Sequence, residues 1–265
     1  MKKYDDIFLS LVDDFSKHKL VEAVLLSGSR TTGNFDKNSD YDLYIYSNKE
    51  IPLDFRKEMS NKYFNYFELN NTTWEKEDQG FFKGINIPID IVYRNLNWIE
   101  NMLEEIVIKC QASTGYTTCF WANIINSDIL YDKNGELERI QNKFDVDYSE
   151  KLRKNFPLLN QIIPAYTHQV EKALKRDDYI SVNHRITAFF ESYFDIIFAI
   201  NKTLHLGEKK LLKITTEELD FIPKNMESDI KELFDNLYNR EFDIINKLDD
   251  ITNELKDLLV SLNLI

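Results

Sequence analysis

The sequence predicts an α+β protein in which a small mixed-sheet domain, residues 1–145, is followed by an all-α helical bundle, residues 146–265. Short alternating apolar runs, which are typical of strands, occur only before residue 145. After residue 149, apolar residues recur at three- and four-residue steps, as expected for helices that bury one face. With 265 residues and 43% hydrophobic content, the chain can bury a large core and is long enough for two domains.

The predicted domain is organised around the stretch LLSGSRTTGNFDKNSDYDLYIY, residues 25–46. An amphipathic helix over residues 3–18 precedes it, and the apolar run at 23–26 predicts a strand that ends at a Gly28-Ser29 turn. A short helix follows, and Asp40-Tyr41-Asp42 opens a second strand. Because strand side chains point to one face at every second position, Asp40 and Asp42 should project together.

This pair of carboxylates next to a glycine turn points to metal and phosphate chemistry. Two adjacent carboxylates repel each other unless a cation lies between them, and oxygen-rich pairs suit magnesium completed by substrate phosphates. Gly28 lacks Cβ and so lets a phosphate approach the backbone, while N–H groups at the next helix start face the anion. An isolated Asp-x-Asp would more often lie on the solvent-exposed face of an edge strand, but the glycine turn at this spacing favours a metal site.

A Gly28-Ser29 turn followed by Asp40-x-Asp42 resembles the signature of the polymerase-beta-like nucleotidyltransferase superfamily. That superfamily usually has a third acidic residue on a later strand of the same sheet, and Asp90 in the apolar run 85–93 is the candidate. The resemblance implies that the three aspartates bind two magnesium ions and are catalytic. It also implies that Gly28 and Ser29 hold the β- and γ-phosphates of a nucleoside triphosphate, with Arg30 adding a charge-assisted contact.

The remaining elements of the domain follow from local patterns. Residues 51–64 read as a helix with Pro52 in its first turn, and residues 66–69 as a strand. The polar segment 70–84 is expected to be a loop at the mouth of the site. Its residues Trp74, Glu75, Glu77 and Asp78 either contact substrate or metal or are simply solvated. Helices over 95–110, 117–125 and 136–144 and a strand over 128–131 complete the domain.

The bundle is predicted from helices over residues 158–174, 179–200, 228–238 and 241–262, joined by short loops. Pro157 is expected to start the first of these helices and Pro164 to kink it. The helix over 179–200 is apolar on almost all sides except for one stripe at four-residue steps, formed by Asn183, Thr187, Glu191 and Asp195.

Two interpretations of this stripe stay open. It is either an ordinary exposed stripe, or it faces the catalytic aspartates across a domain cleft, with Glu191 accepting a proton from an acceptor hydroxyl. In the second case the bundle forms the acceptor side of the cleft. Nearby, Lys209 and Lys210 either belong to a helix start or reach the triphosphate.

A wider resemblance covers most of the chain. The segments GYTTCFWANIINSDILYD and SVNHRITAFFESYFDIIFAINKTLHLGEKK, together with the signature, look like bacterial predicted nucleotidyltransferases that carry a domain called DUF4037. By layout only, the chain is also similar to aminoglycoside and lincosamide nucleotidyltransferases, in which helices help to close the acceptor site.

The amino-acid composition of the chain restricts the kinds of partner that we expect it to bind. A net charge of −12 argues against a nucleic-acid surface, which needs clustered Lys and Arg. Cys110 and Cys119 form no close metal-binding pair, and no stretch has the length of a membrane span, so we expect a reduced, cytoplasmic protein without a membrane partner. A homodimer is one option for its oligomeric state.

The sequence therefore predicts a magnesium-dependent nucleotidyltransferase. It would move a nucleoside monophosphate, with AMP from ATP as the expected case, to a hydroxyl of a small molecule or protein, and would release pyrophosphate. The alternative is a non-catalytic nucleotide-binding regulatory or antitoxin-like module, against which the retention of Asp40, Asp42 and Asp90 argues.

Overall fold

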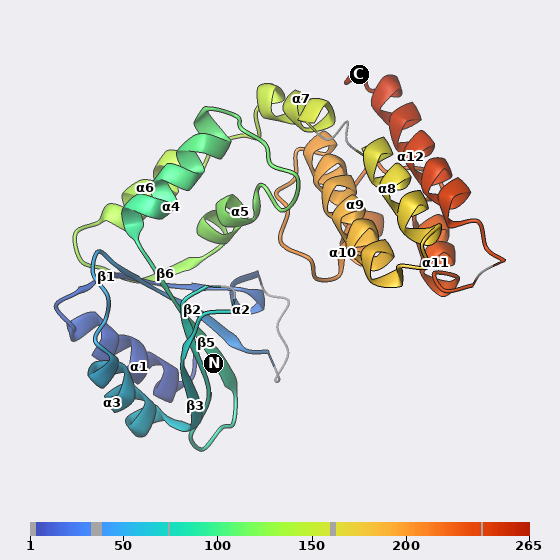
Figure 1. Ribbon diagram of the computed structural model, residues 1–265. Coiled ribbons are helices and arrows are strands. Elements are labelled where there is room, and N and C mark those ends of the chain that lie inside the picture. The colour runs from blue at the N-terminus through green and yellow to red at the C-terminus, as the bar shows by residue number, and fades with distance from the viewer. Residues whose placement is uncertain (1–3, 33–38, 74, 160–162, 240) are drawn as a thin grey trace. The chain divides into compact units, whose positions relative to one another are not determined.

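A computed structural model describes residues 4–32, 39–73, 75–159, 163–239 and 241–265 (Figure 1). The chain forms two compact units, each with its own hydrophobic core. The first unit consists of Met1–Glu104 and Phe120–Val146, and the second of Glu105–Cys119 and Asp147–Ile265. A mixed sheet with helices in the first unit and helices in the second confirm the predicted fold class.

The described part of the first unit is built on a six-stranded sheet with strand order β3-β4-β5-β2-β1-β6. β2 and β5 run parallel, and the other neighbouring strands are antiparallel. The strands are β1 (Val21–Ser27), β2 (Tyr41–Ser47), β3 (Phe64–Asn71), β4 (Glu77–Phe82), β5 (Pro88–Arg94) and β6 (Asp128–Asp132).

One face of this sheet is apolar and is covered by α1 (Asp6–Lys17) and α3 (Leu53–Tyr63) (Figure 1). On β2 the alternate residues Tyr41, Leu43 and Ile45 enter the core with Ile89 and Ile91 of β5. The ring of Tyr41 stacks on Phe8 of α1, with 4.0 Å between centroids. Because strand side chains alternate, the residues between these core positions face the opposite side of the sheet.

Other helices of the first unit are α2 (Ser29–Thr32), α4 (Leu96–Leu103), α5 (Cys119–Ile125) and α6 (Glu136–Phe144), and a π-helical turn at Glu104–Ile108 follows α4. Ion pairs join α4 to α6: Arg139 Nη2 lies 2.7 Å and Lys143 Nζ 2.9 Å from carboxylate oxygens of Glu100. The predicted strand near 128–131 and the helix at 136–144 are confirmed as β6 and α6.

The prediction of a loop over residues 70–84 is wrong, because β4 lies within it. β4 pairs with β3 on one side and β5 on the other, so its backbone hydrogen bonds are made inside the sheet. Its polar sequence hid the strand, since its buried carboxylate, Asp78, is paired with Arg56 rather than solvated. Gly80 suits this strand, because a Cβ there would lie 2.3 Å from the ring of Phe67.

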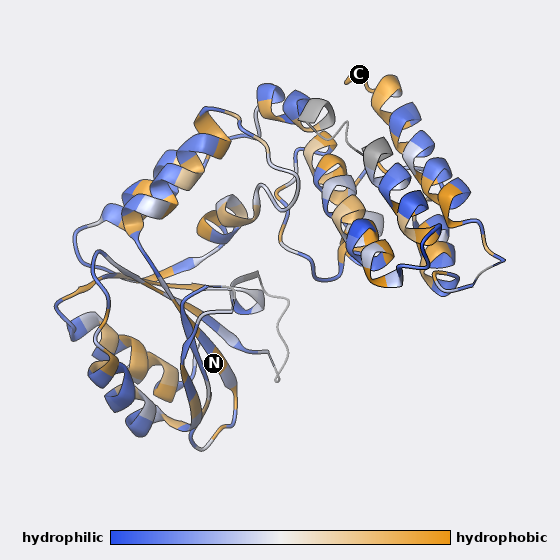
Figure 2. Ribbon diagram, in the orientation of Figure 1, coloured by the Kyte–Doolittle hydropathy of each residue, from blue (hydrophilic) through white to orange (hydrophobic). Residues whose placement is uncertain are grey.

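The second unit is helical over its described residues. Its helices are α7 (Glu150–Leu159), α8 (Ile163–Leu174), α9 (Tyr179–Ile200), α10 (Leu211–Glu218), α11 (Met226–Asp235) and α12 (Ile244–Ser261). α9 packs against α7, α8 and α10, and α12 packs against α8 and α11. Figure 2 shows hydrophilic and hydrophobic residues mixed along α11 and α12, which bury only their apolar side. No helix of the described residues is long and apolar enough to cross a membrane.

The prediction that Pro157 starts a helix is wrong. α7 begins at Glu150, where the Ser149 hydroxyl accepts a hydrogen bond from the backbone N–H of Leu152, so Pro157 lies within the helix. Pro164 lies in the first turn of α8, where a missing N–H costs nothing, and the predicted kink there falls next to residues 160–162, which are outside the described residues. α10 begins directly after residues 207–210, where a helix start was one of the two interpretations.

Candidate functional site

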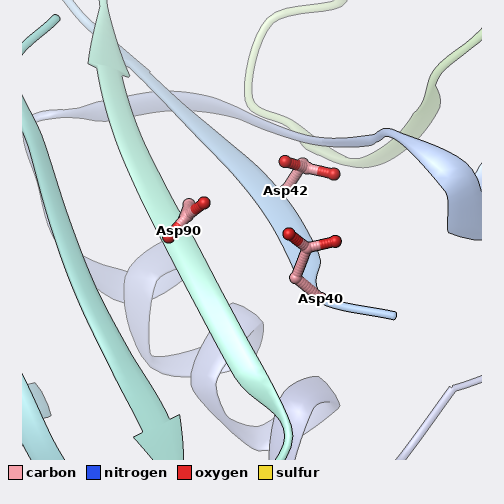
Figure 3. A group of neighbouring side chains, drawn as sticks. All are labelled: Asp40, Asp42 and Asp90. Atoms are coloured by element: carbon pink, nitrogen blue, oxygen red, sulfur yellow. The ribbon is translucent and has the colours of Figure 1, made fainter. Parts of the chain in front are cut away.

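Asp40, Asp42 and Asp90 come together on the face of the sheet opposite α1 and α3. Each offers a carboxylate oxygen within 4.8 Å of the others, and all three side chains are half-buried. Figure 3 shows Asp40 and Asp42 from one segment of chain and Asp90 from the neighbouring strand. The structure thus joins the two carboxylates of the predicted pair with the third, which lies about fifty positions later in the sequence.

Strand pairing explains this convergence. β2 and β5 are parallel neighbours, and Asp42 stands opposite Asp90 in their register. Paired residues point to the same face, and Asp40 lies two positions before Asp42, so the three carboxylates share a face. Asp42 also pairs with Ser27 of β1, which places the end of β1 and the Gly28 turn beside the site.

Gly28 makes the close approach of the turn to Asp42 possible. Its φ is +76°, in the left-handed region that favours glycine. A Cβ built on Gly28 would lie 1.8 Å from Oδ2 of Asp42, far inside a normal contact distance. Any side chain here would therefore have to displace the Asp42 carboxylate.

Arg30 holds the chain that leads into Asp40. Its Nε donates to the carbonyl oxygens of Ser39 at 3.1 Å and of Asp40 at 2.8 Å, and Nη2 donates to Ser39 at 2.5 Å. The guanidinium also lies 3.9 Å from the centre of the Tyr41 ring, a cation–π contact. Arg30 therefore positions the first carboxylate of the trio, and its contact with a phosphate stays a prediction.

A network of hydrogen-bonded polar side chains on the same face was not predicted from the sequence. Arg94 follows Asp90 by four positions on β5, and its Nε and Nη2 donate to Glu75 at 2.8 and 2.6 Å. Arg94 Nη1 donates to Asn123 Oδ1 at 3.1 Å, and Asn123 Nδ2 donates to the Ser27 hydroxyl at 2.8 Å. The period of two along β5 could have placed Arg94 beside Asp90, but its partners come from distant segments.

Aromatic rings surround Arg94. Its guanidinium lies 4.3 Å from the centre of the Tyr44 ring and 4.9 Å from that of Phe120. Tyr44 follows Asp42 by two positions on β2 and so shares its face. Burial raises the pKa of Tyr44 to about 12. The charge of Arg94 lowers this pKa and the charge of Asp42 raises it, but burial has the largest effect, so the phenol is neutral at physiological pH. These contacts stabilise the face of the sheet next to the carboxylates.

The acidic residues of the segment before β5 have structural partners. Glu75 pairs with Arg94, and Asp78 pairs with Arg56 in the interior. Glu77 is half-buried on β4, and burial together with the charges of Glu75, Glu68 and Asp78 raises the pKa of its carboxyl. Trp74 lies outside the described residues.

The predicted bundle residues all lie in the second unit. Lys209 and Lys210 are exposed just before α10, and Glu191 is half-buried on α9. The expectation that the whole stripe faces solvent or a polar cleft is wrong at Asp195, which is buried and accepts hydrogen bonds from Thr117 N and Oγ1 at 3.3 and 3.1 Å. The predicted roles of Glu191, Lys209 and Lys210 towards nucleotide and acceptor stay predictions.

The aspartate trio fits a magnesium site on the chemistry of its donors. Magnesium prefers carboxylate oxygens and completes its shell with water and substrate phosphates. Three half-buried carboxylates within 4.8 Å of one another would otherwise repel. Gly28, whose missing Cβ leaves room against Asp42, keeps the adjoining backbone close to the same oxygens.

Comparison with known proteins agrees with this geometry. Residues 10–110 match the family described as "Polymerase beta, Nucleotidyltransferase". The matched stretch lies almost entirely within the first unit. This match spans β1, the Gly28 turn, β2 and β5, and so includes all three aspartates.

Among solved structures, the chain is similar to a nucleotidyltransferase-like protein from Exiguobacterium sibiricum 255-15, with a TM-score of 0.44 and 10% sequence identity. That similarity covers 95% of this chain and 73% of the other. No curated protein matches the sequence.

Proposed function

We propose that this protein is a nucleotidyltransferase that moves a nucleoside monophosphate from a nucleoside triphosphate, with ATP as the expected donor, to a hydroxyl of a small molecule or protein. The observation that carries the proposal is the convergence of Asp40, Asp42 and Asp90 beside the Gly28 turn. Their position inside a stretch that matches a nucleotidyltransferase family supports it further.

The three aspartates would hold two magnesium ions. Magnesium at such a site lowers the pKa of the attacking hydroxyl and stabilises charge on the α-phosphate and on the leaving pyrophosphate. Gly28 and Ser29 would contact the β- and γ-phosphates, because the turn offers backbone without a Cβ next to Asp42. Arg30 would keep Asp40 in place through its bonds to the preceding carbonyl groups.

The proposed reaction balances as a single displacement. The acceptor oxygen forms a bond to the α-phosphorus, and the bond from that phosphorus to the bridging oxygen of pyrophosphate breaks. The hydroxyl proton passes to a base, for which Glu191 is the candidate predicted from the sequence. We also propose that this chain is related to the bacterial predicted nucleotidyltransferases that carry a DUF4037 domain.

The test measures metal binding and catalysis separately on the full chain. Mn²⁺ binding by electron paramagnetic resonance is expected for the wild type and should weaken at least tenfold in Asp40→Asn, Asp42→Asn and Asp90→Asn. Pyrophosphate release from Mg²⁺ and ATP is then measured against a panel of hydroxyl-bearing metabolites, aminoglycosides and proteins. The same three variants should lose essentially all release, since each removes a metal ligand.

A matched control is Asp54→Asn, because Asp54 is an exposed carboxylate on α3 that pairs with Lys57 at 3.8 Å. It should bind Mn²⁺ and turn over as the wild type does. Near-normal turnover in Asp40→Asn or Asp42→Asn would overturn the proposal. Tight binding of Mg²⁺ and ATP without pyrophosphate release across the panel would instead support the regulatory-module alternative.

A further inference from the structure

The second unit contains a cavity of about 560 Å³, and its lining includes Glu191, the base candidate of the proposed reaction. This volume lies in the range of ~300–1,000 Å³ that is usual for small-molecule sites. Most of its wall is apolar and comes from three helices, α9, α10 and α11, through Phe190, Phe194, Leu211, Leu212, Ile230 and Phe234. Such a wall would bury the apolar body of a ligand.

Glu191 is the charged group set into this wall. It is half-buried on α9 between the buried rings of Phe190 and Phe194, all three of which line the cavity. Within the described parts of the chain, its carboxylate has no hydrogen-bond or ion-pair partner. A carboxylate that is partly removed from water without a counter-charge is costly, so a cation in the cavity would be stabilised there.

The neighbouring segment holds Glu191 in place. A Cβ on Gly115 would lie 3.0 Å from the Cβ of Glu191, so the backbone at Gly115 packs directly against this side chain. The next residue of α9, Ser192, donates its hydroxyl to the Thr114 carbonyl at 2.8 Å. The backbone and Cβ of Glu191 are therefore held at the cavity wall before any ligand arrives, which lowers the entropic cost of binding.

The other charges of the cavity lie at its rim. Lys210, Lys213 and Glu208 are exposed, and Lys213 lies 3.8 Å from the carboxylate of Glu217. Exposed charges are screened by solvent, so the half-buried Glu191 decides the preference of the interior. Tyr116 also lines the cavity, and an aromatic face attracts a cation.

We propose that this cavity binds an organic molecule that carries a protonated amine on an apolar body. The ammonium group would pair with Glu191 next to Tyr116, and the apolar body would lie along the rings of Phe190 and Phe194. Binding of the amine can be tested without nucleotidyl transfer, because every lining residue belongs to the second unit and the aspartate trio belongs to the first.

The test uses three probes that share one body and differ in head group: 4-phenylbutylamine, 4-phenylbutanol and 4-phenylbutyrate. Binding to the full chain is measured by calorimetry without nucleotide. The amine should bind at least tenfold more tightly than the alcohol, and the carboxylate more weakly than the alcohol. Glu191→Gln should remove the preference for the amine and leave the affinity for the alcohol unchanged.

Glu217→Gln is the matched control, because it makes the same charge change on α10 outside the cavity lining. It should leave the preference for the amine intact, and circular dichroism melts should show that both variants fold. Absence of saturable amine binding to the wild type overturns the proposal. A preference for the carboxylate, or equal losses in Glu191→Gln and Glu217→Gln, overturns it as well.

Discussion

Gly28 stands where a β-carbon and the Asp42 carboxylate would occupy the same space. Two separate constraints act there: a φ of +76° and a distance of 1.8 Å from the built Cβ to Asp42 Oδ2. Gly84 shares only the first constraint, since its φ is +82° and a Cβ there meets nothing within 4 Å. The two glycines therefore separate backbone strain from damage to the site.

We predict that Gly28→Ala lowers Mn²⁺ affinity at least tenfold, because the new methyl group must displace Asp42. Gly84→Ala should lower stability by about 1–2 kcal/mol through the left-handed backbone alone and should bind Mn²⁺ normally. Electron paramagnetic resonance titrations and urea unfolding of both variants measure these effects. Equal Mn²⁺ affinities in the two variants would contradict the placement of Gly28 against the metal ligands.

Asp195 is a buried carboxyl, and burial raises its pKa to about 7. The hydrogen bonds from Thr117 lower this pKa, and the charge of Glu191 raises it further. Oδ1 of Asp195 lies 4.0 Å from Nε2 of His205, and neither atom has a hydrogen-bond partner among the described residues. Burial lowers the pKa of His205 to about 4, so the imidazole is neutral at pH 7 and gives Asp195 no counter-charge.

These shifts predict opposite pH effects. The folded state holds the Asp195 proton more tightly than the unfolded chain, so this residue's contribution to stability falls as pH rises from about 4 to about 7. His205 acts in the other direction: its contribution falls as pH drops from about 6.5 towards 4. A comparison of the wild type with an Asp195 variant isolates the first effect.

Asp195→Asn keeps an oxygen that accepts from Thr117 and removes the charge. We predict that its stability relative to the wild type grows by about 2–4 kcal/mol between pH 4.5 and pH 8. Urea unfolding followed by far-ultraviolet circular dichroism at both pH values measures this difference. A difference that does not change with pH would show that the Asp195 carboxyl titrates normally.

At the scale of elements, β4 shows how a polar strand is stabilised inside a sheet. Arg56 of α3 and Asp78 of β4 form an ion pair at 2.7 Å, with side chains 1% and 0% exposed. Asp78 also accepts hydrogen bonds from Asn70 N at 2.7 Å and Tyr93 Oη at 2.8 Å. One carboxylate thus ties α3, β3 and β5 to β4.

Asp78→Asn should destabilise the first unit by about 3–5 kcal/mol, because it removes the buried partner of Arg56 and leaves only the exposed carboxylate of Glu50, 3.9 Å away. Asp54→Asn, at an exposed pair on the same helix α3, should leave stability unchanged. Urea unfolding monitored by tryptophan fluorescence reports on both variants. If Asp78→Asn is as stable as Asp54→Asn, the buried pair does not secure β4.

At the scale of the whole molecule, the two units have separate cores, and the spectroscopic probes divide between them. The three tryptophans of the sequence, Trp74, Trp98 and Trp121, belong to the first unit. The second unit is helical over its described residues, so its unfolding appears in circular dichroism at 222 nm but not in tryptophan fluorescence. Ligand effects on one unit can therefore be separated from effects on the other.

We predict that Mg²⁺ with a non-hydrolysable ATP analogue raises the thermal midpoint seen by fluorescence by several degrees. A ligand at ~100 times its dissociation constant stabilises the state it binds by about 2.7 kcal/mol. The part of the circular dichroism transition that comes from the second unit should keep its midpoint. Equal shifts in both signals would mean that the units unfold as one cooperative body.

The fold class, the strand pair around the Gly28 turn and the projection of Asp40 and Asp42 to one face could all be predicted from the sequence. These follow from local periodicity and short spacing, which act within about ten residues. The long apolar helix α9 was predicted with both ends correct for the same reason.

Only the tertiary structure decided which distant residues meet. The parallel register of β2 and β5 brings Asp90 opposite Asp42, and the sheet turns the polar segment 77–82 into the strand β4. The partners of Arg94 and Asp195 are likewise remote: Thr117 and Asp195 are 78 positions apart. Such pairings depend on how strands and helices assemble around a core, a long-range property that no local pattern carries.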